Sequence, residues 1–235
     1  MVQLRIKTTR RSHFDQNSRI IFNETDGLCL IVDPGYDAMA IMKESMLDKY
    51  KLSGIVLTHA HLDHAGAVAS LIHMIASDYG IAAPLLYHID ERPIARAIEM
   101  IAAQYGLSGM YHNAPDASTW VRHGDTISFG QLSWDIYVTP GHSPGHICLY
   151  STPDEVEFSG DFAIPACSDL PILIAGDTLF KGSIGRTDLP MGNHAQLLTS
   201  IRDVHLQLPE STIVLPGHGP NTTIGIEKRE NPFLI

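Results

Sequence analysis

Four side chains that can bind a metal ion follow one apolar segment of the chain. The segment is 54–57, Gly-Ile-Val-Leu, and His59, His61, Asp63 and His64 come directly after it. An apolar run of this kind predicts a buried strand, and leaving several polar groups unpaired at its end would cost free energy. A divalent ion satisfies them, because neutral imidazole and carboxylate oxygen are common metal ligands. This segment therefore predicts a metal site.

Three further metal-capable residues follow other predicted strands. His142 lies in a loop rich in Pro and Gly, Asp177 follows a glycine, and His218 lies between two glycines. Tight loops at the ends of rigid strands are places where proteins commonly build their sites. His146 is the one rival to His142, and the Thr-Pro-Gly turn before His142 favours His142. We expect these three residues to join the first cluster.

Seven ligands are too many for one ion, because a catalytic ion takes three protein ligands and keeps an open position. They suffice for two divalent ions that share one carboxylate. We expect the first ion on His59, His61 and His142, the second on Asp63, His64 and His218, and Asp177 as the bridge. Such a centre would be locally positive inside an acidic protein, and would attract a carbonyl oxygen or an anion.

The elements that must position these residues follow from apolar patterning. The predicted strands are 2–7, 19–22, 28–32, 55–57, 84–87, 134–138, 147–150, 172–175 and 212–215. The predicted helices are 37–50, 66–79, 91–105 and 195–206. The weak pattern at 111–125 predicts a surface loop. This order, strands then helices and strands then helices again, predicts sheets covered by helices on their outer faces, in a single domain over 1–235.

The composition narrows the class of protein. With 235 residues, 44% hydrophobic and 18% charged, the chain is typical of a globular protein. The net charge of −10 disfavours nucleic acid as a partner, because phosphate binding needs a basic face. Cys29, Cys148 and Cys167 show no CxxC spacing, which predicts no disulfide framework. No apolar run is long enough for a membrane span and no signal peptide is evident, so we expect a cytoplasmic protein without a membrane partner.

The ligand motifs together resemble a known family. The pattern THxHxDH at 58–64, His142 in PGHSPGH, Gly-Asp at 176–177 and PGHG at 216–219 is similar to the signature of the metallo-β-lactamase-fold superfamily. Within it, GDTLF at 176–180, GSIGR at 182–186 and NPFL at 231–234 resemble a short branch of glyoxalase II, the hydroxyacylglutathione hydrolase. The resemblance implies an αββα four-layer sandwich of the α/β (α+β) class. It also implies two divalent ions, with zinc expected and iron or manganese accepted by the same ligands.

The resemblance also implies a reaction. Glyoxalase II hydrolyses a thioester such as S-lactoylglutathione to a hydroxy acid and glutathione, by attack of a hydroxide that bridges the two ions. Asp63 is the expected catalytic residue, because its free oxygen can orient the hydroxide. Arg186 matches the basic residue that binds the glutathione carboxylate, and Lys181 is a second candidate. The expected partner is therefore a small-molecule thioester, a glutathione conjugate, while the sequence predicts no oligomeric state.

Two features depart from the glyoxalase II pattern. Only a short segment follows His218, so we expect no C-terminal helical domain that would bind substrate. The segment 151–171 is longer and more polar than the pattern requires, and we expect an insertion or a long hairpin that could line the pocket. It contains a second Gly-Asp pair with Asp161, but the apolar strand 172–175 favours Asp177 as the ligand.

A second enzyme class shares the fold and similar motifs. A persulfide dioxygenase binds a single iron ion with two histidines and an aspartate, and often carries Gly-Arg-Thr-Asp, as at 185–188 here. The segments 176–186 and 231–234 favour the hydrolase. A lactonase, a β-lactamase and an RNA nuclease agree less well with the sequence, the nuclease because of the negative charge. A non-catalytic binding module would leave all seven ligands without a role.

Overall fold

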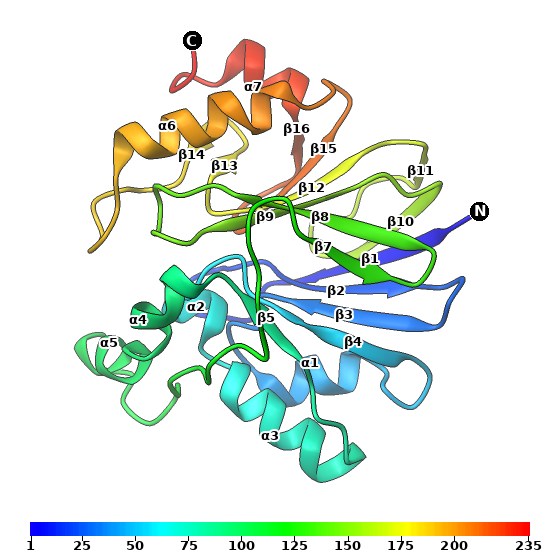
Figure 1. Ribbon diagram of the computed structural model, residues 1–235, viewed down its shortest axis with the longest axis vertical. Helices are drawn as coiled ribbons and strands as arrows, with labels where there is room; N and C mark the ends of the chain where they lie inside the picture. The colour runs from blue at the N-terminus through cyan, green and yellow to red at the C-terminus, as the bar shows by residue number, and fades with distance from the viewer.

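Two β-sheets stacked face to face form the centre of the protein, and helices cover the outer face of each (Figure 1). The computed structural model describes residues 1–235. The layers run helix, sheet, sheet, helix, which confirms the expected α/β class and the αββα sandwich. None of the helices combines the length and the hydropathy needed to cross a membrane.

The first sheet contains eight strands. In spatial order these are β11 (Cys167–Ser168), β10 (Glu155–Gly160), β1 (Gln3–Thr9), β2 (Ser18–Asn23), β3 (Leu28–Val32), β4 (Lys51–Val56), β5 (Leu85–Tyr87) and β6 (Thr119–Trp120). The pairs β1–β2 and β2–β3 are antiparallel, whereas β3, β4, β5 and β6 run parallel to one another. β10 lies parallel to β1 at the other edge.

The second sheet contains six strands. In spatial order these are β16 (Thr222–Thr223), β15 (Ile213–Pro216), β12 (Ile172–Gly176), β9 (Ile147–Ser151), β8 (Leu132–Val138) and β7 (Thr126–Phe129). A separate hairpin consists of β13 (Leu179–Phe180) and β14 (Ser183–Ile184).

The helices divide between the two outer faces. They are α1 (Ala38–Glu44), α2 (Leu62–Ala65), α3 (Val68–Tyr79), α4 (Arg92–Ala95), α5 (Ile98–Gln104), α6 (His194–Asp203) and α7 (Ile224–Glu230), with the 3-10 turns η1 (Ile89–Glu91) and η2 (His205–Gln207). The helices α1 to α5 pack on the first sheet, and α6 and α7 pack on the second.

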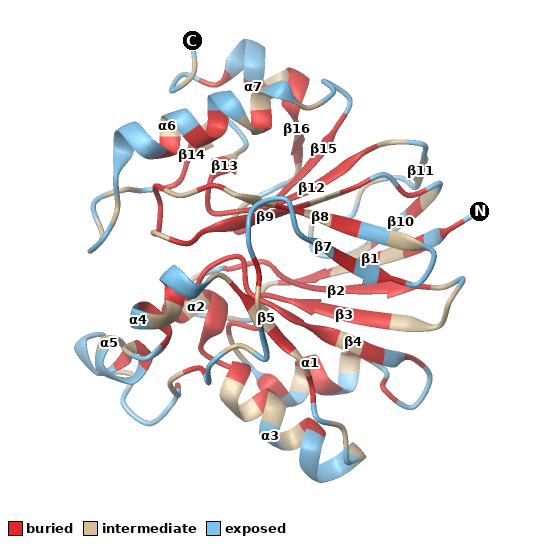
Figure 2. Cartoon of the chain, viewed as in Figure 1, coloured by how far each residue is buried: buried red, intermediate tan, exposed pale blue.

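Apolar side chains alternate along the strands, so each sheet takes part in two cores. In β3, Cys29 and Ile31 face the helices, while Leu30 and Val32 face the second sheet. Trp134 of β8 belongs to the core between the sheets. Figure 2 shows the result, with the central strands buried and the helices exposed along their outer sides.

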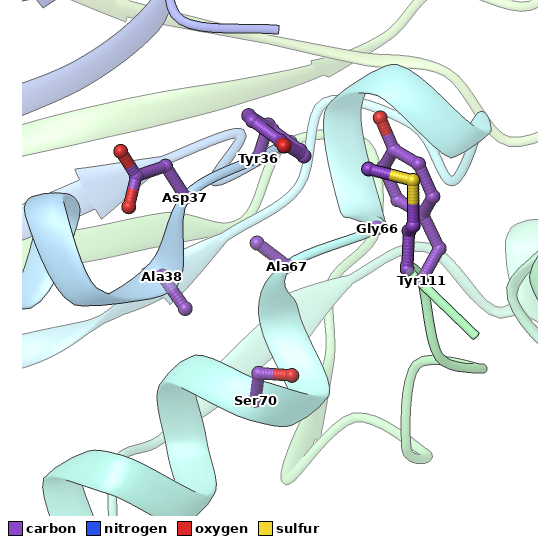
Figure 3. Close-up of a pocket in the computed structure, with 9 residues that line it drawn as sticks. Tyr36, Asp37, Ala38, Gly66, Ala67, Ser70 and Tyr111 are labelled. Carbon is purple, nitrogen blue, oxygen red and sulfur yellow. The ribbon is translucent and has the colours of Figure 1, made fainter. Parts of the chain in front are cut away.

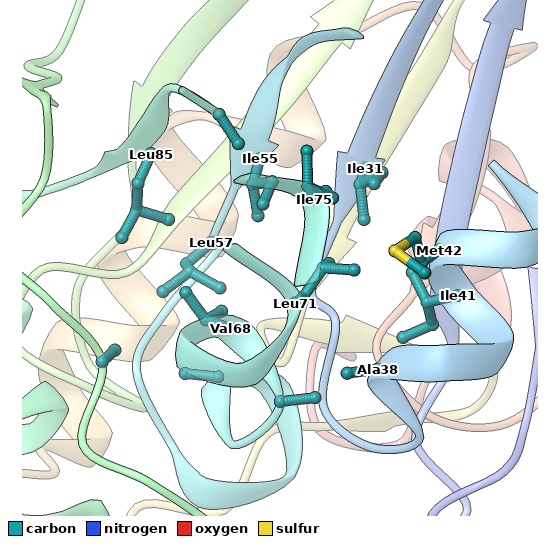
Figure 4. Packing of buried hydrophobic residues seen from close by; sticks show 14 of the residues in the cluster. Ile31, Ala38, Ile41, Met42, Ile55, Leu57, Val68, Leu71, Ile75 and Leu85 are labelled. Carbon is teal, nitrogen blue, oxygen red and sulfur yellow. The ribbon is translucent and has the colours of Figure 1, made fainter. Parts of the chain in front are cut away.

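The core between the first sheet and its helices includes side chains of β4, the strand that leads to the first predicted ligands (Figure 4). Ile31 and Ile55 project from the sheet, and Ile41 of α1 and Leu71 and Ile75 of α3 cover them. Each of these side chains is at most 1% exposed. A fully buried side chain of this size stabilises a protein by about 1.5–3 kcal/mol. This packing fixes β3 and β4, and with them the loops that follow.

Four strands that precede the predicted ligands end at one edge of the sandwich. β4 leads to His59, β8 to His142, β12 to Asp177 and β15 to His218. β12 and β15 are parallel, and β8 and β12 each pair antiparallel with β9, so β8, β12 and β15 point the same way. Their carboxyl ends therefore present three ligands side by side.

Two of the expected helices differ from the structure. The helix expected over 37–50 ends as α1 at Glu44, because Met46 takes a positive φ of 52° that interrupts a right-handed helix. The helix expected over 91–105 is divided into α4 and α5 by the turn at Arg96 and Ala97.

Two weakly patterned segments also contribute to the first sheet. The surface loop expected over 111–125 contains the short strand β6, and Tyr111 is only 1% exposed, so that expectation is wrong at these positions. The segment 151–171, expected as an insertion or a long hairpin, forms β10 and β11, which pair antiparallel with each other. Val156 and Phe158 of β10 face the core between the sheets.

Candidate metal centre

The first ligand set comes together at the edge of the sandwich. Nε2 of His142 lies 3.2 Å from Nε2 of His59 and 2.9 Å from Nδ1 of His61. Two nitrogens bound tetrahedrally to one zinc ion at its usual bond length are about 3.3 Å apart. The three imidazole nitrogens are therefore spaced as ligands of one ion would be.

The second set lies beside the first. Nε2 of His218 is 3.1 Å from Oδ2 of Asp63 and 3.4 Å from Nε2 of His64. Nε2 of His64 is 3.8 Å from the same Asp63 oxygen. The ligand atoms within each set all lie within 4.8 Å of one another. These two sets are the ones that the sequence predicts, and Asp161 belongs to neither.

Asp177 lies between the two sets. Its Oδ1 is 3.3 Å from Nε2 of His64, and its Oδ2 is 3.6 Å from Nε2 of His142 and 3.4 Å from Nε2 of His218. The side chain is buried, and Oδ1 has no hydrogen-bond donor. A buried carboxylate oxygen without a donor is costly, and a cation on that oxygen would remove the cost. The donor set therefore fits two divalent ions that share Asp177.

Hydrogen bonds at the far side of the rings turn the free nitrogens toward the cluster. Nδ1 of His64 donates to Oδ2 of Asp33 at 3.0 Å, and Nδ1 of His142 donates to the backbone carbonyl of Arg186 at 2.7 Å. Thr58 also donates its hydroxyl to Asp33, at 2.7 Å, so its oxygen can accept from Nδ1 of His59 at 3.0 Å. In each ring Nε2 keeps its lone pair for a metal ion.

The electrostatics of the cluster suit metal binding. Burial, together with a smaller contribution from the charge of His142, lowers the pKa of His61 to about 3, so the ring is neutral at neutral pH. Burial would raise the pKa of Asp63 and Asp177, but the charge of nearby His64 holds both pKa values below their ordinary range. Burial would lower the pKa of His64, but these carboxylates raise it, so an ion bound at Nε2 of His64 would displace the proton of that ring. Neutral imidazoles and ionised carboxylates are the forms that bind divalent ions.

Two buried acidic residues support the cluster without belonging to it. Asp33 is not among the predicted ligands, yet it holds His64 and the backbone of Thr58 after β4. Its position directly after a buried strand, like that of His59, is the signal that could have revealed it. Glu91, which begins a predicted helix, accepts hydrogen bonds from two ligand-bearing loops. Nothing in the local sequence distinguishes Glu91 from an exposed residue.

His146 lies behind the cluster. The backbone N–H of Asp177 donates to Nε2 of His146 at 3.0 Å, so Nδ1 carries the proton and donates to Oγ1 of Thr139 at 2.9 Å. Thr139 in turn contacts Sγ of Cys148 at 3.2 Å. The structure therefore gives His146 a positioning role at the shared carboxylate, and leaves His142 as the histidine that faces the other ligands.

A cleft of about 580 Å³ opens over the cluster, and its lining includes His61, Asp63, His142, Asp177 and His218. Arg186 also lines it, with the guanidinium held by the Asp188 carboxylate at 2.7 and 2.8 Å. Lys181 lies in the exposed turn between β13 and β14, outside this lining. No residue of the segment 151–171 lines the cleft.

A second cavity, of about 410 Å³, contains none of the seven predicted ligands (Figure 3). Tyr36 and Tyr111 lie along it, and the ring of Tyr111 packs closely against the backbone of Gly66. Its one acidic residue is Asp37, whose carboxylate accepts from the backbone N–H of Ala40 at 3.1 Å and so caps α1. This cavity offers no set of metal ligands, so the candidate metal centre lies in the cleft.

Comparison with known proteins agrees with this geometry. A family model described as the metallo-beta-lactamase superfamily matches residues 14–171 and 166–218. The chain belongs to the metallo-beta-lactamase superfamily. A superfamily relative from Haemophilus influenzae, named hydroxyacylglutathione hydrolase GloC, is 32% identical over 94% of this chain and 93% of its own length. A probable metallo-hydrolase from Bacillus subtilis, YqgX, is 35% identical over 89% of each chain.

Solved structures of this superfamily superpose on the whole sandwich. The B3 metallo-beta-lactamase BLEG-1 has a TM-score of 0.77 at 33% identity, covering 97% of this chain and 99% of that one. TTHA1623 in a di-iron-bound form has a TM-score of 0.74 at 29% identity, with the same coverage. With its cluster of histidines and aspartates, the chain is a metal-dependent hydrolase of the superfamily, and the cluster is suited to divalent metals.

Proposed function

We propose that the protein hydrolyses a thioester such as S-lactoylglutathione, at a centre that holds two divalent ions. The observation that carries the proposal is the position of Asp177, whose oxygens lie 3.3 Å from a nitrogen of His64 and 3.6 Å from a nitrogen of His142. One carboxylate that reaches a ligand from each set suits two adjacent ions. The similarity to a relative named hydroxyacylglutathione hydrolase supports a glutathione thioester as the substrate.

When bound, the two ions lower the pKa of a water nucleophile and polarise the substrate carbonyl. We propose zinc, and the same ligands accept iron or manganese. Asp63 lies on the cleft lining with its side chain 20% exposed, so its carboxylate can accept a hydrogen bond from the attacking water and orient it. Arg186 lines the same cleft and supplies the positive charge for a carboxylate of the thiol half.

A persulfide dioxygenase with one iron ion is the alternative. It needs only two histidines and one aspartate, which would leave the second set of Asp63, His64 and His218 without a role. The hydrogen bond from His64 to buried Asp33 orients a ring that such a site would not use. The complete second set therefore favours the hydrolase.

The test is the loss of thioester absorbance when the metal-loaded protein meets S-lactoylglutathione, with and without a chelator. We expect rapid hydrolysis that the chelator stops and added zinc restores. Asp63→Ala and His61→Ala should abolish turnover, and His61→Ala should also lose metal. Asp161→Ala is the matched control, because Asp161 follows a glycine as Asp177 does but belongs to no ligand set, and it should keep the wild-type rate.

No hydrolysis by protein that holds two ions would overturn the proposal, as would a wild-type rate in the Asp63 or His61 variant. Oxygen consumption with glutathione persulfide by protein that does not hydrolyse thioesters would support the dioxygenase instead.

A further inference from the structure

The cleft over the ligand cluster has an apolar wall that the metal centre does not need. One side of the wall is formed by Ile94 of α4, Met100 of α5 and Ala97 between the two helices. The other side is formed by Pro190 and Met191, in the loop before α6. Figure 1 shows these two segments facing each other at the same edge of the sandwich. The wall is therefore built from distant parts of the sequence and adjoins the predicted ligands.

The wall leaves large apolar side chains open to solvent. Met100 is 62% exposed, Tyr105 is 58% exposed and Met191 is 54% exposed, and all three line the cleft. Exposed apolar side chains gathered around a concave site mark a ligand surface. Methionine is unbranched and flexible, so these side chains can close over an apolar group of variable shape.

Charge is scarce in the cleft beyond the metal-capable residues. Arg186 is the one other charged residue of the lining, and the wall residues themselves carry no charge. An anionic group that lay against the wall would meet no cation and would lose hydration, which costs free energy. The wall therefore suits the part of a substrate that carries no charge.

We propose that this wall binds an apolar acyl chain, so that the preferred substrates are thioesters of medium-chain acyl groups. The inference depends on the proposed function, because the thioester carbonyl must lie at the ligand cluster. Arg186 then binds a carboxylate of the thiol half, and the apolar wall covers the acyl half. A lactoyl group is short and polar, and would leave the wall uncovered.

The test compares glutathione thioesters that share one thiol and differ in the acyl group: lactoyl, acetyl, butanoyl and octanoyl. A buried methylene contributes about 0.8 kcal/mol, or about fourfold in binding. We expect kcat/KM for the octanoyl thioester to exceed that for the acetyl thioester by at least about tenfold, mainly through KM. Equal values, or a decline with chain length, would overturn the inference and leave the proposed function intact.

A variant pair assigns the effect to the wall. Met100→Gln places a polar side chain of similar length in the cleft. We expect it to lower the ratio of kcat/KM for the octanoyl thioester to kcat/KM for the acetyl thioester at least about threefold. Met39→Gln is the matched control, because Met39 is 67% exposed on α1 and lines neither cavity. The same ratio in both variants would show that the wall does not select the acyl chain.

A binding measurement separates this inference from the proposed function. Calorimetry with the uncleavable thioethers S-octylglutathione and S-methylglutathione needs no turnover. We expect the octyl compound to bind at least about tenfold more tightly, with the negative heat-capacity change of apolar burial. Tighter binding of the octyl compound without hydrolysis of any thioester would support the binding of an apolar chain by the wall and would overturn the proposed function. Equal binding of the two thioethers would show that the wall does not bind an apolar chain, whatever the rates of thioester hydrolysis.

Discussion

The carboxylate of Glu91 accepts a hydrogen bond from the backbone N–H of Gly145 at 2.8 Å. Its other oxygen accepts from the backbone N–H of Ala60, also at 2.8 Å. Ala60 lies between two ligands of the first set, and Gly145 lies in the loop that carries His142. One fully buried carboxylate therefore holds together the two loops that build the first metal site.

Replacing Glu91 should weaken that site selectively. In Glu91→Gln the amide nitrogen cannot accept a hydrogen bond, so one buried backbone N–H loses its partner. We expect this to cost about 1–3 kcal/mol of the free energy of unfolding. We also expect it to weaken metal binding at the first site about tenfold or more. Competition with a chromophoric chelator measures both sites, and an equal loss at both would contradict the selective role of Glu91.

Asp33 should act on the second site. Its carboxylate accepts from the backbone N–H of Thr58 at 2.7 Å and from Nδ1 of His64 at 3.0 Å. Asp33→Asn keeps the shape but removes an acceptor and the negative charge, so the ring of His64 loses its orientation. We expect affinity for the second ion to fall about 10- to 100-fold in the same chelator competition. Asp37→Asn, on the neighbouring helix cap, is the control, and an unchanged affinity in Asp33→Asn would contradict this role.

Much of the site could be predicted because its ligands follow strands with clear apolar patterns. His59 and Asp177 each end such a strand, and the parallel pairing of β12 with β15 brings Asp177 to His218 as expected. Asp33 also follows a buried strand, but its contact with His64 depends on the parallel register of β3 and β4, which pairs Val32 with Val56. That register is a property of the sheet, so the local sequence could mark Asp33 as a candidate but could not assign its partner.

The strand β10 shows why parts of the fold could not be predicted. Val156 and Phe158 are buried and alternate with Glu155 and Glu157, which is a strand pattern. It lies within a polar segment, and its pairing with β1 joins residues about 150 positions apart. The wall of the cleft was missed for a similar reason, because the tertiary fold alone brings α5 opposite Met191.

Arg186 should affect substrate binding more than the chemical step. Its side chain is 61% exposed, so the guanidinium can exchange Asp188 for a substrate carboxylate. In Arg186→Ala we expect KM for S-lactoylglutathione to rise several-fold while kcat changes little, as for an interaction made equally in the ground and transition states. Lys181→Ala is the control, because this exposed lysine lies outside the cleft. A fall in kcat without a change in KM would contradict the binding role.

Burial of His205 should make the stability of the protein depend on pH. Burial lowers the pKa of His205 from 6.5 to about 4, so the unfolded chain binds a proton more readily than the folded one between these values. Above about pH 6.5 the ring is neutral in both states and His205 does not affect stability. As the pH falls from about 6.5 toward about 4, the unfolded chain takes up a proton that the folded chain does not, and the free energy of unfolding decreases. A single such group gives a slope of at most about 1.4 kcal/mol per pH unit.

The variant His205→Gln isolates this effect. Glutamine can keep a hydrogen bond to Thr178, which lies 2.8 Å from Nε2 of His205, but it does not titrate. Urea unfolding of the metal-free proteins at pH 5 and pH 7 should show a flatter pH dependence in the variant. The same slope in both proteins would show that His205 takes up its proton without unfolding.

The number of divalent ions that each chain holds tests the central claim most directly. The two ligand sets meet at Asp177, which reaches His64 at 3.3 Å and His142 at 3.6 Å. Elemental analysis of zinc-loaded protein after dialysis should give two ions per chain in the wild type, and fewer in Asp177→Ala. One ion per chain in active wild-type protein would contradict the account, because a single ion leaves one of the two ligand sets empty.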